Sequence, residues 1–325
     1  MSIIVVEHLS KTYRVAKKNA GLKATLKHFF ARDYRYIQAV KDISFTIEPG
    51  ECVGFLGANG AGKTTALKML TGLIHPTDGQ VKVLGYNPFD RKADFLRQIT
   101  LVMGQKQQLI WDLPAVDSLR INASVYGIDN QTYRRRLDEL KEMLDLEEEL
   151  TQPVRKLSLG QRMKVELLAA LLHHPKVLFL DEPTLGLDIN AQAAVRQFLK
   201  DYNQQYQATM LLTSHYMADI TALCPRVLLI HDGGIHYDGS LSGVVDQFAP
   251  YRQVKVDLEN QPTLEQMSRY GKVESLQGHV VQLMVKREAL TRVVSQLLSD
   301  FNVTDLVVTD PPIEKIMGKI FKGGT

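Results

Sequence analysis

The stretch Gly57-Ala58-Asn59-Gly60-Ala61-Gly62-Lys63-Thr64-Thr65 decides the fold of this chain. It matches the pattern G-x-x-x-x-G-K-[ST], in which glycines let the backbone curl and point several N–H groups at one phosphate chain. Lys63 can reach the outer phosphates as a point charge, and Thr64 carries a hydroxyl where Mg²⁺ would sit. The predicted phosphate contacts are Asn59, Gly60, Ala61, Gly62, Lys63, Thr64 and Thr65.

The segments on either side of this loop agree with that interpretation. Residues 51–56 have the apolar pattern of a buried strand, and residues 63–73 have the pattern of a helix. A helix that begins near Lys63 directs its positive dipole end at the same place as the glycine-rich backbone. The motif requires this strand–loop–helix context, and a chance glycine-rich turn does not supply it.

Composition sets the broad class of the protein. The 325 residues suffice for one large domain and a smaller one, and 45% hydrophobic with 23% charged residues is ordinary for a globular protein. A net charge of +3 is too small to indicate nucleic-acid binding. Cys52 and Cys224 suit a reducing compartment and form no disulfide framework. We find no signal peptide and no run of about 18 apolar residues, so we expect a cytosolic protein or one held at a membrane by a partner.

The rest of the chain is organised in three blocks. Strand-like and helix-like segments alternate through most of residues 2–248, which predicts a mainly parallel sheet covered by helices. Residues 112–173 interrupt this alternation with a mostly helical block. After about residue 248 the order strand, helix, two strands, helix, strand predicts a compact ferredoxin-like second domain.

A basic segment near the N-terminus stands out from this pattern. Lysines and arginines dominate residues 11–35, in which Asp33 is the acid. Within them one helical face would carry four apolar side chains, namely Leu22, Leu26, Phe29 and Phe30. Such a basic amphipathic helix could lie on an anionic membrane surface or dock on a partner, or it could pack on its own domain. The residues leave both interpretations open.

A second cluster of candidate residues follows two later strands. The apolar run 177–180 ends in Asp181 and Glu182. Asp181 at a strand tip can hold Mg²⁺ through water, and Glu182 can orient and deprotonate an attacking water. His215 follows the strand predicted at 208–213 and could touch a terminal phosphate, although a lone histidine is more often structural.

These segments together resemble the ATP-binding subunits of ABC transporters, across about residues 3–245. The resemblance identifies residues 57–65 with Walker A and residues 177–182 with Walker B, which makes Glu182 the catalytic glutamate. It implies that Gln105 is the Q-loop glutamine, a Mg²⁺ and water contact, and that His215 is the switch histidine. Tyr13 falls where the family has its adenine-stacking aromatic, although its position after a strand also fits a half-buried surface tyrosine.

The family's dimer motifs are also present. Residues 157–161, Leu-Ser-Leu-Gly-Gln, resemble the LSGGQ signature, with Leu159 in place of a glycine, and Asp188 ends a segment that resembles the D-loop. Ser158 is a natural N-cap, and the helix after it would aim free N–H groups at an anion. The resemblance implies that this anion is the γ-phosphate held by a second subunit. Ser158, Gly160, Gln161 and Asp188 would then contact ATP across a dimer interface.

The resemblance implies a fold and a function for the whole chain. The expected architecture is an α/β P-loop NTPase core (1–248) with an inserted helical subdomain (about 106–173) and a basic insertion (about 14–37). A small α+β ferredoxin-like accessory domain (249–325) would follow. The insertion and the tail resemble ABC-2 type exporters of the daunorubicin-resistance and viologen-exporter-like groups. ATP and Mg²⁺ would be the cofactors, and hydrolysis would drive export through separate permease subunits at the cytoplasmic face of the membrane. The other partner would be a second ATPase subunit, as a homodimer, with no nucleic acid.

Two alternatives remain open at this point. A soluble ABC ATPase that acts on ribosomes or DNA would be expected to carry two such domains or a long coiled coil, and this chain shows neither pattern. An importer subunit would more often carry a small β-barrel tail than alternating strands and helices. Specificity for the transported substrate would lie in the membrane subunits.

Overall fold

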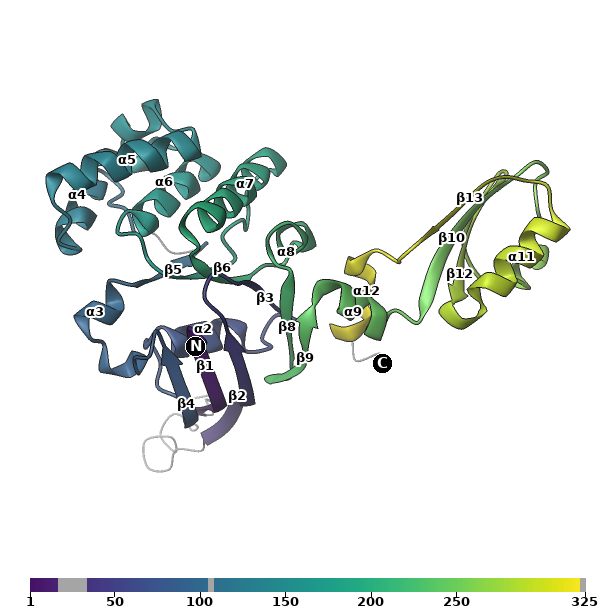
Figure 1. The fold of residues 1–325 in the computed structure, drawn as a ribbon, viewed down its shortest axis with the longest axis horizontal. Coiled ribbons are helices and arrows are strands. Elements are labelled where there is room, and N and C mark those ends of the chain that lie inside the picture. The colour runs from purple at the N-terminus through teal and green to yellow at the C-terminus, as the bar shows by residue number, and fades with distance from the viewer. Residues whose placement is uncertain (17–33, 105–107, 322–325) are drawn as a thin grey trace, which may run out of the picture. The chain divides into compact units, whose positions relative to one another are not determined.

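The computed structural model describes residues 1–16, 34–104 and 108–321. The chain forms two compact units, Met1–Asp238 and Gly239–Thr325, and each is described by itself (Figure 1). Within the described ranges, no helix has the length and apolar character needed to cross a membrane.

The first unit is built on a six-stranded sheet. Its strand order is β5 (Ile99–Met103), β6 (Val177–Asp181), β7 (Thr209–Thr213), β3 (Cys52–Leu56), β8 (Arg226–His231) and β9 (Gly234–Ser240). The first five strands run parallel, and every residue of β3 and β7 is buried. Such continuous apolar strands are expected where helices cover both faces of a parallel sheet. The carboxyl ends of β3, β5, β6 and β7 therefore meet at one edge.

A smaller antiparallel sheet lies beside this one, with the order β2 (Tyr34–Ile47), β1 (Ile4–Ala16) and β4 (Asp78–Val83). Helix α2 (Lys63–Leu70) lies between the two sheets, while α7 (Ile189–Tyr206) and α8 (Met217–Leu223) lie on the other side of the large sheet (Figure 1). Side chains from β1, β2, β3, β4 and α2 share one buried core. This core fixes the helix that follows the phosphate loop.

The first two strands are longer than the sequence predicts. The apolar pattern of the sequence predicts strands at residues 2–8 and 40–48, but β1 continues to Ala16 and β2 begins at Tyr34. These extensions pair with each other, with Ala16 opposite Tyr34. The ends of the predicted insertion 14–37 are therefore strand, and the amphipathic helix predicted near residues 20–31 lies outside the described residues.

The inserted helical block is confirmed. It connects β5 to β6 and contains α4 (Ala115–Val125), α5 (Asn130–Leu144), two short 3₁₀ turns (Glu148–Thr151 and Val154–Lys156) and α6 (Leu159–Leu171). In Figure 1 these helices gather on the side of the large sheet away from β1, β2 and β4. A 3₁₀ turn (Pro88–Asp90) and the short α3 (Ala93–Leu96) join β4 to β5.

The second unit confirms the predicted order of strands and helices. Its elements are α9 (Leu241–Phe248), β10 (Tyr251–Leu258), α10 (Leu264–Ser268), β11 (Lys272–Gln277), β12 (Val280–Lys286), a 3₁₀ turn (Arg287–Ala289), α11 (Leu290–Asp300), β13 (Val303–Thr309) and α12 (Ile313–Phe321). The sheet order β11-β12-β10-β13 is antiparallel throughout, which is the ferredoxin-like arrangement. The division at Asp238 places α9 in this unit, whereas the proposed domain border lies after Phe248.

Candidate functional site

The glycine-rich loop connects β3 to α2, and the structure explains two of its glycines. Gly62 has φ +110°, a left-handed conformation, and a Cβ added there would lie 2.4 Å from the carbonyl oxygen of Ala39. A Cβ on Gly57 would lie 2.5 Å from the carbonyl oxygen of Ile230. Both distances are too short for any side chain. The loop is therefore pressed between β2 and β8, and this packing fixes its curled shape.

Lys63 is held inside that loop. Its ammonium donates hydrogen bonds to the carbonyl oxygens of Gly57 (2.7 Å) and Ala58 (3.1 Å), and the residue is 6% exposed. Burial lowers the pKa of this ammonium, and the negative charges of Glu182 and Asp181 act in the opposite direction. The two carboxylates thus favour the cation that a phosphate chain requires. A cavity of about 160 Å³ lies beside it and is lined by Ala39, Asn59, Gly60, Gly62, Lys63, Thr64, Thr65 and Glu182.

Asp181 joins the two halves of the site. The hydroxyl Oγ1 of Thr64 lies 2.9 Å from Asp181 Oδ2, and the hydroxyl of Thr213 donates to Asp181 Oδ1 at 2.7 Å. Thr64 lies in the first turn of α2, whereas Asp181 and Thr213 end the neighbouring strands β6 and β7. A hydroxyl and a carboxylate facing each other provide the hard oxygen ligands that Mg²⁺ prefers. Across the described part of the chain, no group of three or more His, Cys, Asp or Glu side chains could hold a metal ion by itself.

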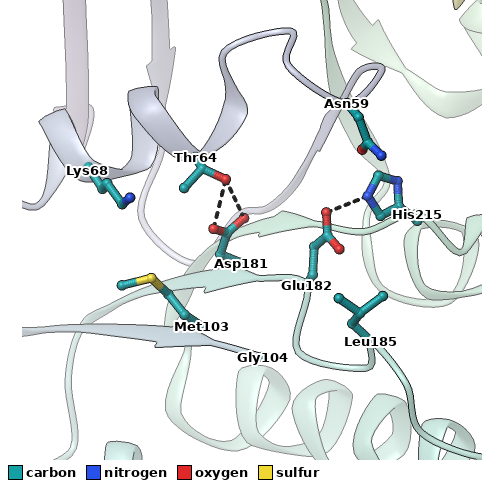
Figure 2. Close-up of a pocket in the computed structure, with 9 residues that line it drawn as sticks. All are labelled: Asn59, Thr64, Lys68, Met103, Gly104, Asp181, Glu182, Leu185 and His215. Carbon is teal, nitrogen blue, oxygen red and sulfur yellow. Dashed lines mark hydrogen bonds and ion pairs between the residues drawn. The ribbon is translucent and has the colours of Figure 1, made fainter. Parts of the chain in front are cut away.

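Glu182 and His215 form the other polar contact of the site. His215 Nε2 lies 2.7 Å from Glu182 Oε1 (Figure 2). The Glu182 side chain is 18% exposed, and its backbone has φ +55°. A left-handed conformation at a non-glycine residue costs of order 1–3 kcal/mol and persists where the surroundings enforce it. Glu182 N–H is fixed by the carbonyl oxygen of Thr213 at 3.1 Å.

These groups surround one cavity of about 600 Å³. Figure 2 shows its lining residues, which come from the phosphate loop, α2, β5, β6 and the loops after β6 and β7. The members are Asn59, Thr64, Lys68, Met103, Gly104, Asp181, Glu182, Leu185 and His215. The parallel sheet thus brings together the phosphate loop, Asp181, Glu182 and His215, as the sequence analysis expected.

The residues of the predicted signature, 158–161, lie outside these cavities at the start of α6. Ser158 caps α6 with a reciprocal pair of hydrogen bonds, because its hydroxyl accepts from Gln161 N–H (3.2 Å) and its own N–H donates to Gln161 Oε1 (3.0 Å). A Cβ on Gly160 would lie 2.8 Å from the Cβ of Ala191 on α7, so a glycine is required there. Ser158, Gly160 and Gln161 line neither of the two cavities described above.

Asp188 and Leu159 are exposed residues that also make contacts within their own chain. The carboxylate of Asp188 caps α7 by accepting from Ala191 N–H at 2.9 Å, and Asp188 lines neither cavity. Leu159 is 39% exposed and lies against Gly186, where an added Cβ would come within 3.3 Å of Leu159 Cδ2. The unusual leucine therefore uses space that a glycine in the loop before α7 leaves free.

Tyr13 lies on β1 and pairs with the part of β2 that leads to the phosphate loop. It pairs with Ile37 on β2, two residues before Ala39, whose carbonyl oxygen approaches Gly62. The Lys11 ammonium lies 5.4 Å from the centre of the Tyr13 ring. Tyr13 is half-buried, which agrees with either interpretation of this residue.

Gln105 lies outside the described residues, so its predicted contact stays a prediction. Several residues that the structure places at the site were not predicted from the sequence, among them Lys68 and Leu185, which line the larger cavity. Thr213 ends β7 beside Asp181, Met103 ends β5, and Gly104 follows Met103; Met103 and Gly104 both line the cavity. Their position at the carboxyl ends of neighbouring parallel strands was the available signal.

Comparisons with known proteins agree with this geometry. Residues 40–185 match a family described as "ABC transporter", and residues 250–309 match "EvrA-like ABC transporter, C-terminal domain". The chain is 34% identical over 212 residues to the ABC transporter ATP-binding protein NatA of Bacillus subtilis, covering 65% of this chain and 86% of NatA. It is 28% identical to the bacitracin transport ATP-binding protein BcrA of Bacillus licheniformis, covering 89% and 94%. Among solved structures, an ATP-binding subunit of an ABC transporter superimposes with a TM-score of 0.62 at 28% identity, covering 76% and 93%.

Proposed function

The chain belongs to the ABC transporter family of ATP-binding proteins, and we propose that it is the ATPase subunit of an ABC-2 type exporter. As a member of this family it binds and hydrolyses ATP. The proposal adds that hydrolysis drives export of a substrate through separate membrane permease subunits. Relatives named for bacitracin transport, Nod factor export and linearmycin resistance support it.

The observation that carries the proposal is the convergence of Lys63, Thr64, Asp181, Glu182 and His215 on the described cavities. Lys63 and the curled backbone of the loop bind the phosphate chain by charge and N–H donation. In this role the ammonium of Lys63 exchanges its two carbonyl partners for phosphate oxygens.

The oxygen atoms of Thr64 and Asp181 fit a Mg²⁺ ion that is held mainly by the nucleotide. Thr64 Oγ1 and the Asp181 carboxylate face each other at the cavity wall, and such hard oxygen donors suit this ion. When bound, the ion would neutralise charge on the phosphates. Thr213 holds the Asp181 carboxylate in orientation from the neighbouring strand.

In the proposed hydrolysis, Glu182 takes part in the proton transfer from water and His215 assists it. Glu182 orients the attacking water and accepts its proton, because its carboxylate projects into the cavity (Figure 2). His215 lies within hydrogen-bond distance of that carboxylate and holds it in position. From the same place His215 can donate a hydrogen bond to a terminal phosphate.

We propose that Ser158, Gly160, Gln161 and Asp188 act on the ATP of a second subunit. They line neither cavity of their own chain, yet the cap of α6 presents N–H groups at a helix N-terminus. A structure of a related ATP-binding cassette is a dimer bound to ADP and Pi, with a TM-score of 0.59 at 25% identity. A homodimer at the cytoplasmic face of the membrane, held there by its permease, is the arrangement that we propose.

The test of the catalytic assignment compares two variants. Glu182→Gln should leave ATP binding intact, lower turnover about 100-fold or more and trap an ATP-bound dimer, because only the proton transfer is lost. Lys63→Ala should weaken ATP binding itself, because it removes a phosphate-neutralising charge. Near wild-type turnover in Glu182→Gln would overturn the assignment.

The test of the export assignment is recovery of the full chain from cells. An exporter subunit should co-purify with membrane permease proteins, and addition of those proteins should stimulate its ATPase activity. Recovery with ribosomes instead of membranes would support the alternative of a soluble ABC ATPase.

A further inference from the structure

We propose that Asp219 is a positioning residue for ATP hydrolysis, because its carboxylate joins the loop that follows Glu182 to the loop that carries His215. This inference rests on the roles proposed above for Glu182 and His215. Asp219 does not line the cavity, and it acts through the residues that hold the two loops.

The Asp219 carboxylate is buried at the meeting point of three elements. The residue lies on α8 and is 1% exposed. Its Oδ2 accepts hydrogen bonds from the hydroxyls of Thr184 (2.5 Å) and Ser214 (2.6 Å), and its Oδ1 accepts from Arg196 Nη1 on α7 at 2.9 Å. Both oxygens of the buried charge are thus satisfied, and its counter-charge is supplied.

Thr184 connects the Asp219 carboxylate to the loop that follows Glu182. Thr184 lies two residues after Glu182 and is 1% exposed. The turn between them is closed by a hydrogen bond from Leu185 N–H to the Glu182 carbonyl oxygen at 3.2 Å, and Leu187 N–H donates to the Thr184 carbonyl oxygen at 3.2 Å. Because Glu182 has the strained φ of +55°, the loop after it must be fixed to keep the carboxylate in the cavity.

Ser214 connects the same carboxylate to the loop that carries His215. Its hydroxyl donates to Asp219 and accepts a hydrogen bond from Tyr216 N–H at 3.0 Å, so it fixes the backbone on both sides of His215. A single carboxylate therefore sets the positions of the two residues whose side chains meet at 2.7 Å. Loss of this anchor should misplace Glu182 against His215, and a shift of about 1 Å in a catalytic group can cost on the order of 100-fold in rate.

The central test compares two substitutions of Thr184. Thr184→Val keeps the side-chain volume but removes the hydroxyl, whereas Thr184→Ser keeps the hydroxyl but removes a buried methyl group. Positioning through the hydrogen bond predicts a kcat about tenfold lower in Thr184→Val and within about threefold of wild type in Thr184→Ser. The Kd for ATP and the KM should stay within about twofold in both. A role in packing alone predicts the opposite order.

Asp219→Asn removes the anchor itself, because an amide cannot accept from Arg196 and from both hydroxyls. It should lower kcat at least as much as Thr184→Val. Asp238→Asn is the matched control, since Asp238 accepts two hydrogen bonds from Arg226 (2.7 and 2.8 Å) and lines neither cavity. This control should leave kcat unchanged.

The outcomes separate this inference from the proposed function. If Glu182→Gln abolishes turnover while folded Thr184→Val and Asp219→Asn keep wild-type kcat, the positioning role of Asp219 alone is overturned. If Glu182→Gln itself keeps turnover, both proposals fall. A kcat that follows the melting temperature across all variants, Asp238→Asn included, would also overturn the positioning role.

Discussion

At the scale of single residues, the site depends on backbone shapes that few side chains permit. Gly104 follows β5, and its N–H donates to the carbonyl oxygen of Asp181 at 3.0 Å. A Cβ added at Gly104 would lie 2.3 Å from the carbonyl oxygen of Glu182. The glycine therefore lets the chain after β5 approach the strained Glu182 backbone at the wall of the cavity.

We predict that Gly104→Ala lowers kcat about tenfold or more while the protein remains folded. The added methyl group must displace the Glu182 backbone, and misplacement of a catalytic group is costly. Binding of ATP should change much less, because the phosphate loop is not moved. Gly318→Ala is the control, since an added Cβ there meets nothing. Equal kcat in Gly104→Ala and wild type would contradict the prediction.

At the scale of elements, α6 has two functionally different ends. Its N-terminus carries the Ser158 cap, which we assign to the ATP of a partner. Near its C-terminus, His173 stacks on Tyr126 with ring centres 3.9 Å apart, and its Nε2 lies 3.1 Å from the carbonyl oxygen of Ile99. The helix therefore links the end that carries the Ser158 cap to β5.

The N-terminal end of α6 can be tested by mixing inactive chains. Ser158→Arg should block the contact with a partner's ATP, and Glu182→Gln should block hydrolysis in its own chain. A mixed dimer then contains one complete site, so we predict that mixing restores part of the ATPase activity that each variant lacks alone. Absence of any recovery in verified mixed dimers would show that each site is complete within one chain.

The C-terminal end of α6 predicts acid sensitivity. Burial lowers the pKa of His173 to about 4, so the unfolded chain, with an ordinary pKa of 6.5, binds the proton first as the pH falls. Above about pH 6.5 this histidine therefore leaves the free energy of unfolding unchanged. As the pH falls from there towards about 4, the free energy of unfolding decreases. We expect His173 to account for a loss of about 2 kcal/mol of unfolding free energy between pH 7 and pH 5.

Urea unfolding at both pH values checks this expectation. His173→Gln should lose less stability on acidification than wild type does, whereas the exposed His279→Gln should behave like wild type. The same loss in His173→Gln and wild type would show that burial of this imidazole does not cause the acid sensitivity.

At the scale of the whole molecule, the residues of the candidate site lie in one compact unit and the C-terminal elements form the other. The residues that line the two nucleotide cavities lie in Met1–Asp238. Helix α9 belongs to the second unit and packs on α12, and Val244 of α9 is fully buried. The accessory role that we propose for the C-terminal unit therefore requires no catalytic group from it.

We predict that a chain ending at Asp238 binds ATP with the affinity of the full chain. A chain ending at Phe248 should also bind ATP, but it keeps α9 without α12 and exposes Val244, so it should be less soluble and melt at a lower temperature. Nucleotide titration and thermal unfolding of the two fragments provide the measurements. A folded Met1–Asp238 fragment without nucleotide binding would contradict the prediction.

The sequence by itself determined the α/β core, the inserted helical block, the ferredoxin-like unit and the phosphate loop. These follow from local information, because hydrophobic periodicity and glycine positions act over a few residues. It also named Asp181, Glu182 and His215, since Asp181 ends a strand and the other two residues follow strands closely. These three residues could be predicted to lie close together because the carboxyl ends of parallel strands meet at one edge of a sheet.

Only the tertiary structure decided which of these groups touch and what holds them. The pairing of Glu182 with His215, the support of Asp181 by Thr213 and the anchoring of both loops by Asp219 join residues that lie in different strands and helices. Such contacts depend on strand order and register, which set distances of a few ångströms between segments far apart in the chain. The strain at Glu182 is likewise a property of the packed loop, because the preference of a glutamate by itself is against a positive φ.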